Sequence, residues 1–477
     1  KGAGENPADD AGAPADPSRE AGGEAPGGGV PGEDGLAAWG ATVSGPLREL
    51  ARESARPENL LRLLHFDAHD RRVDEIMLRG STRRALAEAE GAQGLGALHG
   101  DPFRFYARTY LCHQNGEAGV ACSMACTDGL VRALEALGDR PEHERAVERV
   151  RASHRERVWH GAQFVTEIQG GSDVPANDVR ARREGDAWRL HGQKWFCSNV
   201  NADYYLVTAR PEGAPEGGEG VGLFLVPARR DGETLRNGHT VDRLKEKLGT
   251  RELATAEVTF DGALAWPVGP LERGLPNLLR YVLVPSRFAC VVSSAGFLRR
   301  AQRIVEAYTE FREAFGRPVG DYPLVRGSVE EIRRAREESL AAVFGLLALW
   351  ERSRAGEGGA DFRVMLSLCK PVLTSRATRL LHEAMMLLGG NGIEEEFSPL
   401  PRLHRDAVIM EAWEGPHNVL LTQALRDLDR FGVDPEAFVA RLAGGSGAGG
   451  GADPGGGTPR GGAPWAPGGG EAGAGRG

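Results

Sequence analysis

A glycine-rich turn near position 170 is the first part of the chain whose residue types suit ligand binding. Gly170 and Gly171 have no side chains, so a flat or phosphorylated molecule could approach their backbone closely. Thr166 and Ser172 flank them with hydroxyl groups that can donate to ring or phosphate oxygens. Taken alone, the segment is more typical of an ordinary polar β-turn.

A second segment adds the groups that the first one lacks. Trp195 and Phe196 are adjacent aromatic residues, and Cys197 and Ser198 follow them directly. An isoalloxazine ring needs an aromatic wall and a hydrogen-bonding group near its N5 atom. The two segments together indicate a flavin site, although ordinary core packing is the simplest alternative for the two rings.

The hydrophobic pattern divides the chain into three folded parts between two tails. Residues 37–158 have helical composition, residues 159–272 contain short strand-type segments between Gly, Asp and Pro turns, and long helices return over residues 273–442. Residues 1–36 and 443–477 are rich in Gly, Pro and Ala and are predicted to be disordered tails. We expect an α+β fold that is mainly α, with an N-terminal helical domain, a small β domain and a C-terminal four-helix bundle. The clearest predicted strands are residues 187–191, 204–209, 223–226 and 256–260.

Charge and cysteine usage exclude several classes of protein. The net charge is -9, and residues 1–40 contribute eight acids and two bases, so the rest of the chain is close to neutral. No overall basic field favours nucleic acid or an anionic membrane. The six cysteines are few and scattered, which indicates a reducing compartment and a cytoplasmic protein. No apolar run of membrane-spanning length is present, so no membrane span is expected.

A metal site is not predicted. Cys112, His113, Cys122 and Cys126 have side chains that can bind a metal. The stretch that follows position 119 has the composition of an apolar helix, in which cysteines usually serve as packing residues.

Six motifs in order resemble the acyl-CoA dehydrogenase family over about residues 40–435, and together they are far more specific than any one of them. Within that family, the chain most resembles the AidB branch in three places: the sequence around Gln169, the Trp195 and Phe196 pair, and residues 62–67. Members of that branch carry a C-terminal DNA-binding domain; residues 443–477 contain only two bases, so we expect that domain to be missing and duplex DNA not to be a partner. The motifs are the Thr-Glu turn at 166–173, Lys247-Leu248-Gly249-Thr250-Arg251, residues 312–318, Gly389-Gly390-Asn391-Gly392, Arg405-Asp406-Ala407 and Trp413-Glu414-Gly415.

The resemblance implies a middle β-barrel, an FAD cofactor and an acyl-CoA substrate. Glu414 would be the catalytic base that takes the α proton, and Arg287 would be the cation beside it; without the resemblance Glu414 would be an unremarkable acid before a helix. Ser172 and Gly415 would contact the substrate. The residues implied to contact FAD are Phe164, Thr166, Gly171, Ser172, Phe196, Cys197, Ser198, Arg312, Phe315, Gly389, Gly390, Pro416 and Asn418.

The resemblance also implies partners and leaves alternatives open. Arg312 and Phe315 would reach FAD held mainly by another subunit, so we expect a homo-oligomer, and a tetramer in particular. Electrons would pass to an electron-transfer flavoprotein. An acyl-CoA oxidase on the same fold, or an AidB-like flavoprotein of low turnover that binds acyl-CoA or DNA, would share the same motifs. Two positions depart from the family pattern, with Met386 in place of a common glutamine and Pro416 in place of threonine or serine.

Overall fold

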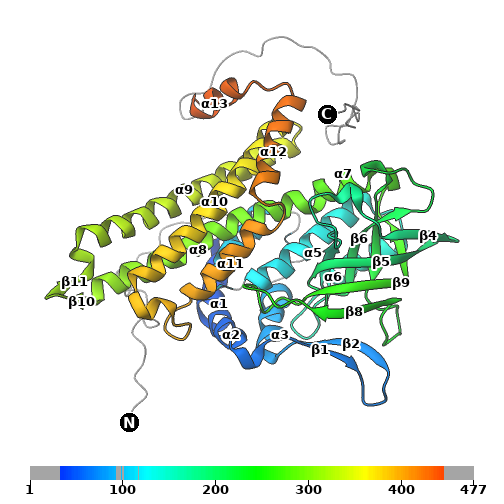
Figure 1. Ribbon diagram of the computed structural model, residues 1–477, viewed down its shortest axis with the longest axis horizontal. Coiled ribbons are helices and arrows are strands. Elements are labelled where there is room, and N and C mark those ends of the chain that lie inside the picture. Colours follow the sequence, from blue (N-terminus) through cyan, green and yellow to red (C-terminus); the bar gives the residue numbers. More distant parts are fainter. Residues whose placement is uncertain (1–32, 93–97, 99–100, 117, 445–477) are drawn as a thin grey trace, which may run out of the picture.

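The computed structural model describes residues 33–92, 98, 101–116 and 118–444, arranged as helices, then strands, then helices (Figure 1). Most of the two predicted tails lies outside the described residues. The first helix, α1 (Glu33–Thr42), begins inside the predicted N-terminal tail, and the last helix, α13 (Pro435–Gly444), ends two residues inside the predicted C-terminal one.

The N-terminal part is helical apart from one hairpin. Its helices are α1, α2 (Arg48–Ser54), α3 (Gly80–Leu86), α4 (Pro102–His113), α5 (Ala118–Leu137) and α6 (Pro141–Arg151), and its strands are β1 (Arg62–Phe66) and β2 (Arg72–Met77). The helical pattern expected over residues 37–158 is therefore wrong at this hairpin. Its turn is made by Asp67, whose carboxylate accepts hydrogen bonds from the backbone N–H groups of His69 and Arg71, and by Asp70 at a φ of 58°.

Seven strands form one sheet in the middle of the chain, and five of them close into a small barrel. They are β3 (Gly161–Phe164), β4 (Arg180–Glu184), β5 (Ala187–Ser198), β6 (Tyr204–Pro211), β7 (Gly222–Pro227), β8 (His239–Leu244) and β9 (Thr255–Pro267). The ring closes through the pairings β6–β4–β5–β9–β7–β6, while β3 pairs with β6 and β8 with β9. The expected fold class, α+β and mainly α with a small middle β-barrel, is confirmed.

The C-terminal part is built around one helix that four others contact. Helix α10 (Gly359–Leu387) packs against α8 (Val284–Phe311), α9 (Pro323–Arg354), α11 (Leu400–Ala412) and α12 (His417–Arg430). The short helix α7 (Gly274–Leu278) leads into α8, and the hairpin of β10 (Glu313–Ala314) and β11 (Arg317–Pro318) separates α8 from α9. By length and composition the stretch Leu271–Phe311 could cross a membrane, but 78% of its apolar window is buried inside the molecule, as in a core helix.

A buried ion pair joins the glycine-rich turn to the barrel. The ammonium group of Lys194 on β5 lies 2.7 Å from the Glu167 carboxylate, and neither side chain is more than 3% exposed. The Glu167 carboxylate also accepts from the backbone N–H groups of Asp178 and Val179. Burial alone would raise the pKa of Glu167, but Lys194 and these N–H groups outweigh it and lower that pKa.

This ion pair gives a prediction about stability. Because Glu167→Gln leaves the Lys194 charge buried without its carboxylate, we expect the free energy of unfolding at neutral pH to fall by about 3 to 5 kcal/mol. The lowered pKa means that the contribution is present above the unfolded-state pKa of about 4.3 and is lost as the pH falls through the folded-state value. Urea unfolding at several pH values measures both effects.

The matched control is Glu184→Gln, which removes a carboxylate whose partner, Arg189, lies at the protein surface. This variant should unfold like the wild type. Equal stability of the Glu167 and Glu184 variants would show that the buried pair does not hold the turn.

Candidate active site

The loop between α11 and α12 holds Glu414 in an unusual backbone conformation. Glu414 has a φ of 57°, in the left-handed region, and Gly415 follows at 107°. A residue other than glycine reaches this region at a cost, and it persists only where the surroundings fix it. The strained residue is therefore a candidate for function.

Two cations fix this loop by binding its carbonyl groups. The Nε of Arg287 on α8 donates to the Glu414 carbonyl oxygen at 2.8 Å. The Nζ of Lys370 on α10 donates to the carbonyl oxygens of Glu411 and Gly415 at 2.7 and 2.9 Å, and Lys370 is fully buried. The loop is thus tied from two helices on either side of Glu414.

The groups around the Glu414 carboxyl shift its pKa. Burial raises its pKa, while a hydrogen bond from Ser286 and the positive charges of Arg287 and Lys370 oppose the rise without cancelling it. A carboxyl group with a raised pKa that remains near cations is suited to accept a proton.

Three thiols form the wall beside this carboxyl. Cys122 and Cys126 lie on α5 with their Sγ atoms 3.8 Å apart, and Cys290 lies on α8. Burial, with a smaller contribution from the Glu414 charge, raises the pKa of Cys290 to about 12. The pKa of Cys126 is also raised, chiefly by its hydrogen bond with Cys122 and by burial. Because the Cys126 and Cys290 thiols stay protonated, they are neutral and weakly polar neighbours of the base.

A bulge in β5 turns both aromatic residues of the second segment outward. Pairing with β9 is irregular between Lys194 and Cys197, so these two residues face the barrel core and Trp195 and Phe196 between them do not. Phe196 is 53% exposed. The ammonium group of Lys245 lies 3.4 Å from the centroid of the Trp195 ring. The bulge thereby creates the aromatic wall that the sequence suggested.

Hydrogen bonds position the Ser198 hydroxyl at the end of that wall. Its oxygen lies 3.3 Å from the Thr255 hydroxyl, which accepts from Lys247 Nζ at 3.0 Å. Burial lowers the pKa of Lys247 to about 8. The backbone N–H of Trp195 donates to the Thr166 carbonyl at 2.9 Å, so the glycine-rich turn lies directly beside the wall.

The loop after β8 docks the barrel onto α11. The backbone N–H of Thr250 donates to the Asp406 carboxylate at 2.7 Å. A Cβ atom on Gly249 would lie 2.5 Å from the Arg405 carbonyl oxygen, so only glycine fits there. Burial raises the pKa of Asp406 to about 8. Since α11 leads directly into the Glu414 loop, this contact helps to fix the position of the base relative to the barrel.

Sequence models of two domains match the chain. They are described as "Acyl-CoA dehydrogenase, middle domain" over residues 162–263 and "Acyl-CoA dehydrogenase, C-terminal domain" over residues 272–428. The chain belongs to the acyl-CoA dehydrogenase family.

Individual relatives agree with this assignment. Acyl-CoA dehydrogenase family member 11 of Caenorhabditis elegans is 33% identical over 82% of this chain and 66% of its own length. The putative acyl-CoA dehydrogenase AidB of Escherichia coli is 31% identical over 79% of this chain and 71% of its own. The chain therefore spans about two thirds of the length of these relatives.

Solved structures share the fold. The C. elegans protein, solved in complex with C11-CoA, superimposes with a TM-score of 0.75 at 30% identity, covering 83% of this chain and 69% of that one. Butyryl-CoA dehydrogenase of Megasphaera elsdenii has a TM-score of 0.69 at 20% identity, covering 85% and 100%, which shows the fold alone.

Two residues expected to contact the cofactor have side chains that face elsewhere. The Phe164 ring lies inside the barrel with its centroid 4.4 Å from that of Tyr205, and Cys197 is also fully buried there. Strand alternation and the β5 bulge direct both side chains inward, and the expected cofactor contact of these residues stays a prediction. Only their backbone could reach a ligand outside the barrel.

Another group of expected residues lies at the far end of the helices. Arg312 and Phe315 belong to the β10–β11 hairpin, which Figure 1 shows at the end of the bundle opposite the barrel. Phe315 is 98% exposed at a φ of 53°. Gly389 and Gly390 follow α10, and a hydrogen bond from Tyr308 to Leu388 ties their turn to α8. Within one chain, these four residues therefore lie away from Glu414 and Ser198.

The remaining expected residues lie near the base or the turn. Pro416 and Asn418 are exposed at the start of α12, directly after Glu414 and Gly415, and Gly171 and Ser172 are exposed in the glycine-rich turn. A Cβ atom on Gly171 would lie 2.6 Å from the Thr166 hydroxyl oxygen, so this close turn requires glycine.

Sequence reasoning missed several residues that shape the site. Ser286 contacts the base. It directly precedes the expected Arg287, and this adjacency was a signal in the sequence. Lys370 is the one base between Arg363 and Arg376 in α10, it stands among apolar residues and Pro371 follows it, a pattern that indicates a buried cation. Thr255 and Lys245 carried no signal.

Proposed function

We propose that this protein is an FAD-dependent acyl-CoA dehydrogenase that introduces an α,β double bond into an acyl-CoA thioester. The observation that carries the proposal is the Glu414 loop, whose strained backbone is held by Arg287 and Lys370 beside a neutral thiol wall. The complex of the C. elegans relative with C11-CoA supports an acyl thioester as the ligand class.

The residues on the barrel suit FAD. Exposed Phe196 offers an aromatic face, the Ser198 hydroxyl offers a hydrogen bond, and the turn at Gly170 and Gly171 presents backbone without side chains. When bound, FAD supplies the acceptor for the β hydride at its N5 atom.

Glu414 is the residue proposed to take the α proton. Its carboxylate must come within hydrogen-bond reach of the α carbon, and Arg287 and Lys370 prevent the loop from relaxing away from that position. The protonated thiols of Cys126 and Cys290 add no further charge near this base. We further propose that electrons leave through a separate electron-transfer flavoprotein.

Chromophore release and anaerobic reduction test this function. The purified protein should carry FAD, identified after denaturation, and a reactive acyl-CoA from a panel of chain lengths should bleach it without oxygen. A colourless protein that takes up no FAD would refute the proposal. FAD that no acyl-CoA reduces would favour a low-turnover binding protein, and rapid reoxidation by oxygen would favour an oxidase.

The pH dependence of flavin reduction follows from the raised pKa of Glu414. The base must be ionised, so the rate should rise with pH through a midpoint above the ordinary glutamate pKa of about 4.3. Ser286→Ala removes a hydrogen bond that lowers this pKa, so its midpoint should move to higher pH. Stopped-flow reduction over a pH series measures both midpoints.

The control for this variant is Ser375→Ala, which removes a partly exposed hydroxyl on α10 that donates to the Val372 backbone carbonyl. Its profile should match the wild type. A midpoint that falls in Ser286→Ala, or that moves equally in both variants, would contradict the assignment.

We also propose a homo-oligomer, most simply a tetramer, in which Arg312 and Phe315 reach FAD bound mainly by another subunit. The proposal is supported by the exposed Phe315 ring and by the distance of this hairpin from the barrel (Figure 1). Light scattering should give a multiple of the chain mass. Phe315→Ala should release FAD more easily, while Phe344→Ala, an exposed aromatic on α9, should not. A monomer that keeps FAD and activity would contradict the proposal.

A further inference from the structure

A cation is fixed against the aromatic wall of the barrel. The Nζ atom of Lys245, directly after β8, lies 3.4 Å from the centroid of the Trp195 ring and 5.0 Å from that of the Phe196 ring. The Lys245 side chain is only 12% exposed. An ammonium group this close to an aromatic ring is attracted to the electrons of its face. Lys245 is therefore a fixed part of the wall and not a mobile surface charge.

The strand β9 holds Lys245 in this position. The carboxylate of Glu257 on β9 accepts hydrogen bonds from the Nζ atom of Lys245 and, at 2.6 Å, from the Nε atom of Arg243. The backbone N–H of Lys245 donates to the Thr255 carbonyl oxygen on the same strand at 2.7 Å. Since the Thr255 hydroxyl lies beside Ser198, one strand positions both the cation and the hydroxyl group at the wall.

The group formed by Lys245, Arg243 and Glu257 carries one net positive charge. Burial alone would raise the pKa of Glu257, but hydrogen bonds from Lys245 and Arg243 outweigh it and lower that pKa, so the carboxyl group is ionised. Two cations therefore accompany one anion. The Arg243 guanidinium lies 5.7 Å from the centroid of the Trp195 ring, so both cations of the group lie beside the wall.

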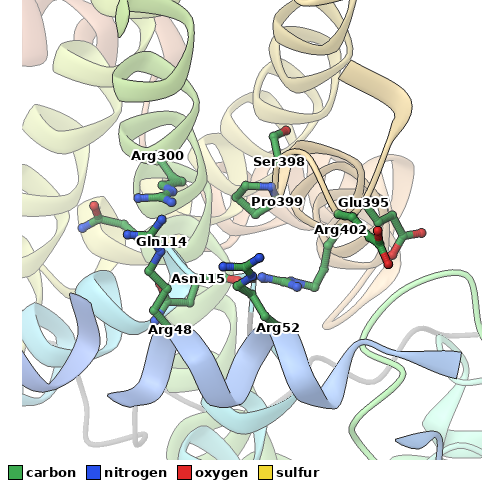
Figure 2. A pocket seen from close by; sticks show the side chains of 10 residues that line it. Arg48, Arg52, Gln114, Asn115, Arg300, Glu395, Ser398, Pro399 and Arg402 are labelled. Atoms are coloured by element: carbon green, nitrogen blue, oxygen red, sulfur yellow. Dashed lines mark hydrogen bonds between the residues drawn. The ribbon is translucent and has the colours of Figure 1, made fainter. Parts of the chain in front are cut away.

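Clustered arginines elsewhere in the molecule contact backbone carbonyls instead of rings. Figure 2 shows Arg402 on α11 beside Asn115, and its Nε and Nη2 atoms donate to the Asn115 carbonyl oxygen at 3.2 and 2.6 Å. That guanidinium group joins α11 to the segment after α4. Lys245 instead places its charge against two rings, one of which, Phe196, is 53% exposed. A charge in this position acts on whatever packs on the exposed ring.

An aromatic ligand on Phe196 would lie within reach of this charge. Packed aromatic rings have centroids about 4.5 to 7 Å apart, so a ring on Phe196 would lie within about 12 Å of the Lys245 Nζ atom. At an effective dielectric constant of about 20, one unit charge at this distance changes an equilibrium between a neutral and a singly charged ring by about tenfold.

We propose that Lys245 is a positioning residue that favours the reduced form of a flavin bound at this wall. The inference rests on the proposed FAD-dependent function. A transferred hydride brings two electrons and one proton to the flavin ring, so the ring gains one negative charge, which the ammonium group of Lys245 stabilises. By holding Trp195 and Phe196 in place, Lys245 also fixes the distance over which its charge acts.

The midpoint potential of the bound FAD tests this proposal without any substrate. Wild type and Lys245→Met, each loaded with FAD, would be reduced anaerobically in equilibrium with a reference dye. Methionine has a similar length but no charge, so the potential should fall by about 30 mV, which corresponds to a tenfold change for a two-electron couple. Lys245→Gln, a second uncharged variant, should lower the potential as well. Lys245→Arg keeps the charge and should stay close to the wild type.

The matched control is Arg157→Met, which removes another cation that lies over a tryptophan. The Arg157 guanidinium lies 3.9 Å from the centroid of the Trp159 ring and pairs with the Asp203 carboxylate at 2.6 Å, in the segment before β3. The potential of this variant should match that of the wild type. Thermal melting checks that each variant folds, and if Lys245→Met does not fold, the Gln and Arg variants decide the test.

Three results would overturn the proposal: equal potentials in the wild type and the uncharged variants, a fall in Lys245→Arg as large as in Lys245→Gln, or an equal fall in Arg157→Met. In each of these cases the protein still binds FAD, so the proposed function would stand. A wild type that takes up no FAD would refute both the inference and the proposed function.

Discussion

A buried ammonium group that binds two backbone carbonyls is the constraint on which the candidate active site depends. Lys370 lies on the helix that four other helices contact, and it donates to Glu411 at the end of α11 and to Gly415 in the loop that follows. Burying an ammonium group is costly unless its hydrogen bonds are satisfied, so these carbonyls must stay where they are. Arg287 then adds a third bond, at Glu414 itself, and the positive φ of that residue is the result.

Helix α11 also connects the Glu414 loop to the barrel. Asp406 on α11 accepts from the Thr250 backbone, and the flanking Lys247 donates to Thr255 beside Ser198. The aromatic wall and the base therefore stand on elements that contact one another, although they are far apart in sequence. This arrangement satisfies the requirement that two reacting groups be held at fixed positions by rigid structure.

The parts of the fold and site that could be predicted are those in which a sequence pattern has one common physical cause. Long helical periodicity and short strands predicted the mainly helical α+β fold, and the resemblance of the Trp413-Glu414-Gly415 turn to the family pattern predicted the candidate base. The inward orientation of the Phe164 and Cys197 side chains could not be predicted, because strand alternation and a bulge that depends on pairing with β9 decide which side chain faces outward. Lys370 could not be connected with Glu414 because the contact exists only after α10 packs against α11. The β1–β2 hairpin was missed because Asp67 and Asp70 form a turn that helical composition around it conceals.

If Glu414 removes the α proton of an acyl thioester, the protein should also exchange that proton with solvent deuterium. Wild type and Glu414→Gln, each loaded with FAD, would be incubated anaerobically in deuterated buffer with an acyl-CoA that both variants bind. Mass spectrometry would then measure deuterium at the α carbon. We expect the wild type to exchange this proton and the variant to exchange it at a rate lower by about 100-fold or more. Exchange at equal rates in the two proteins would contradict it.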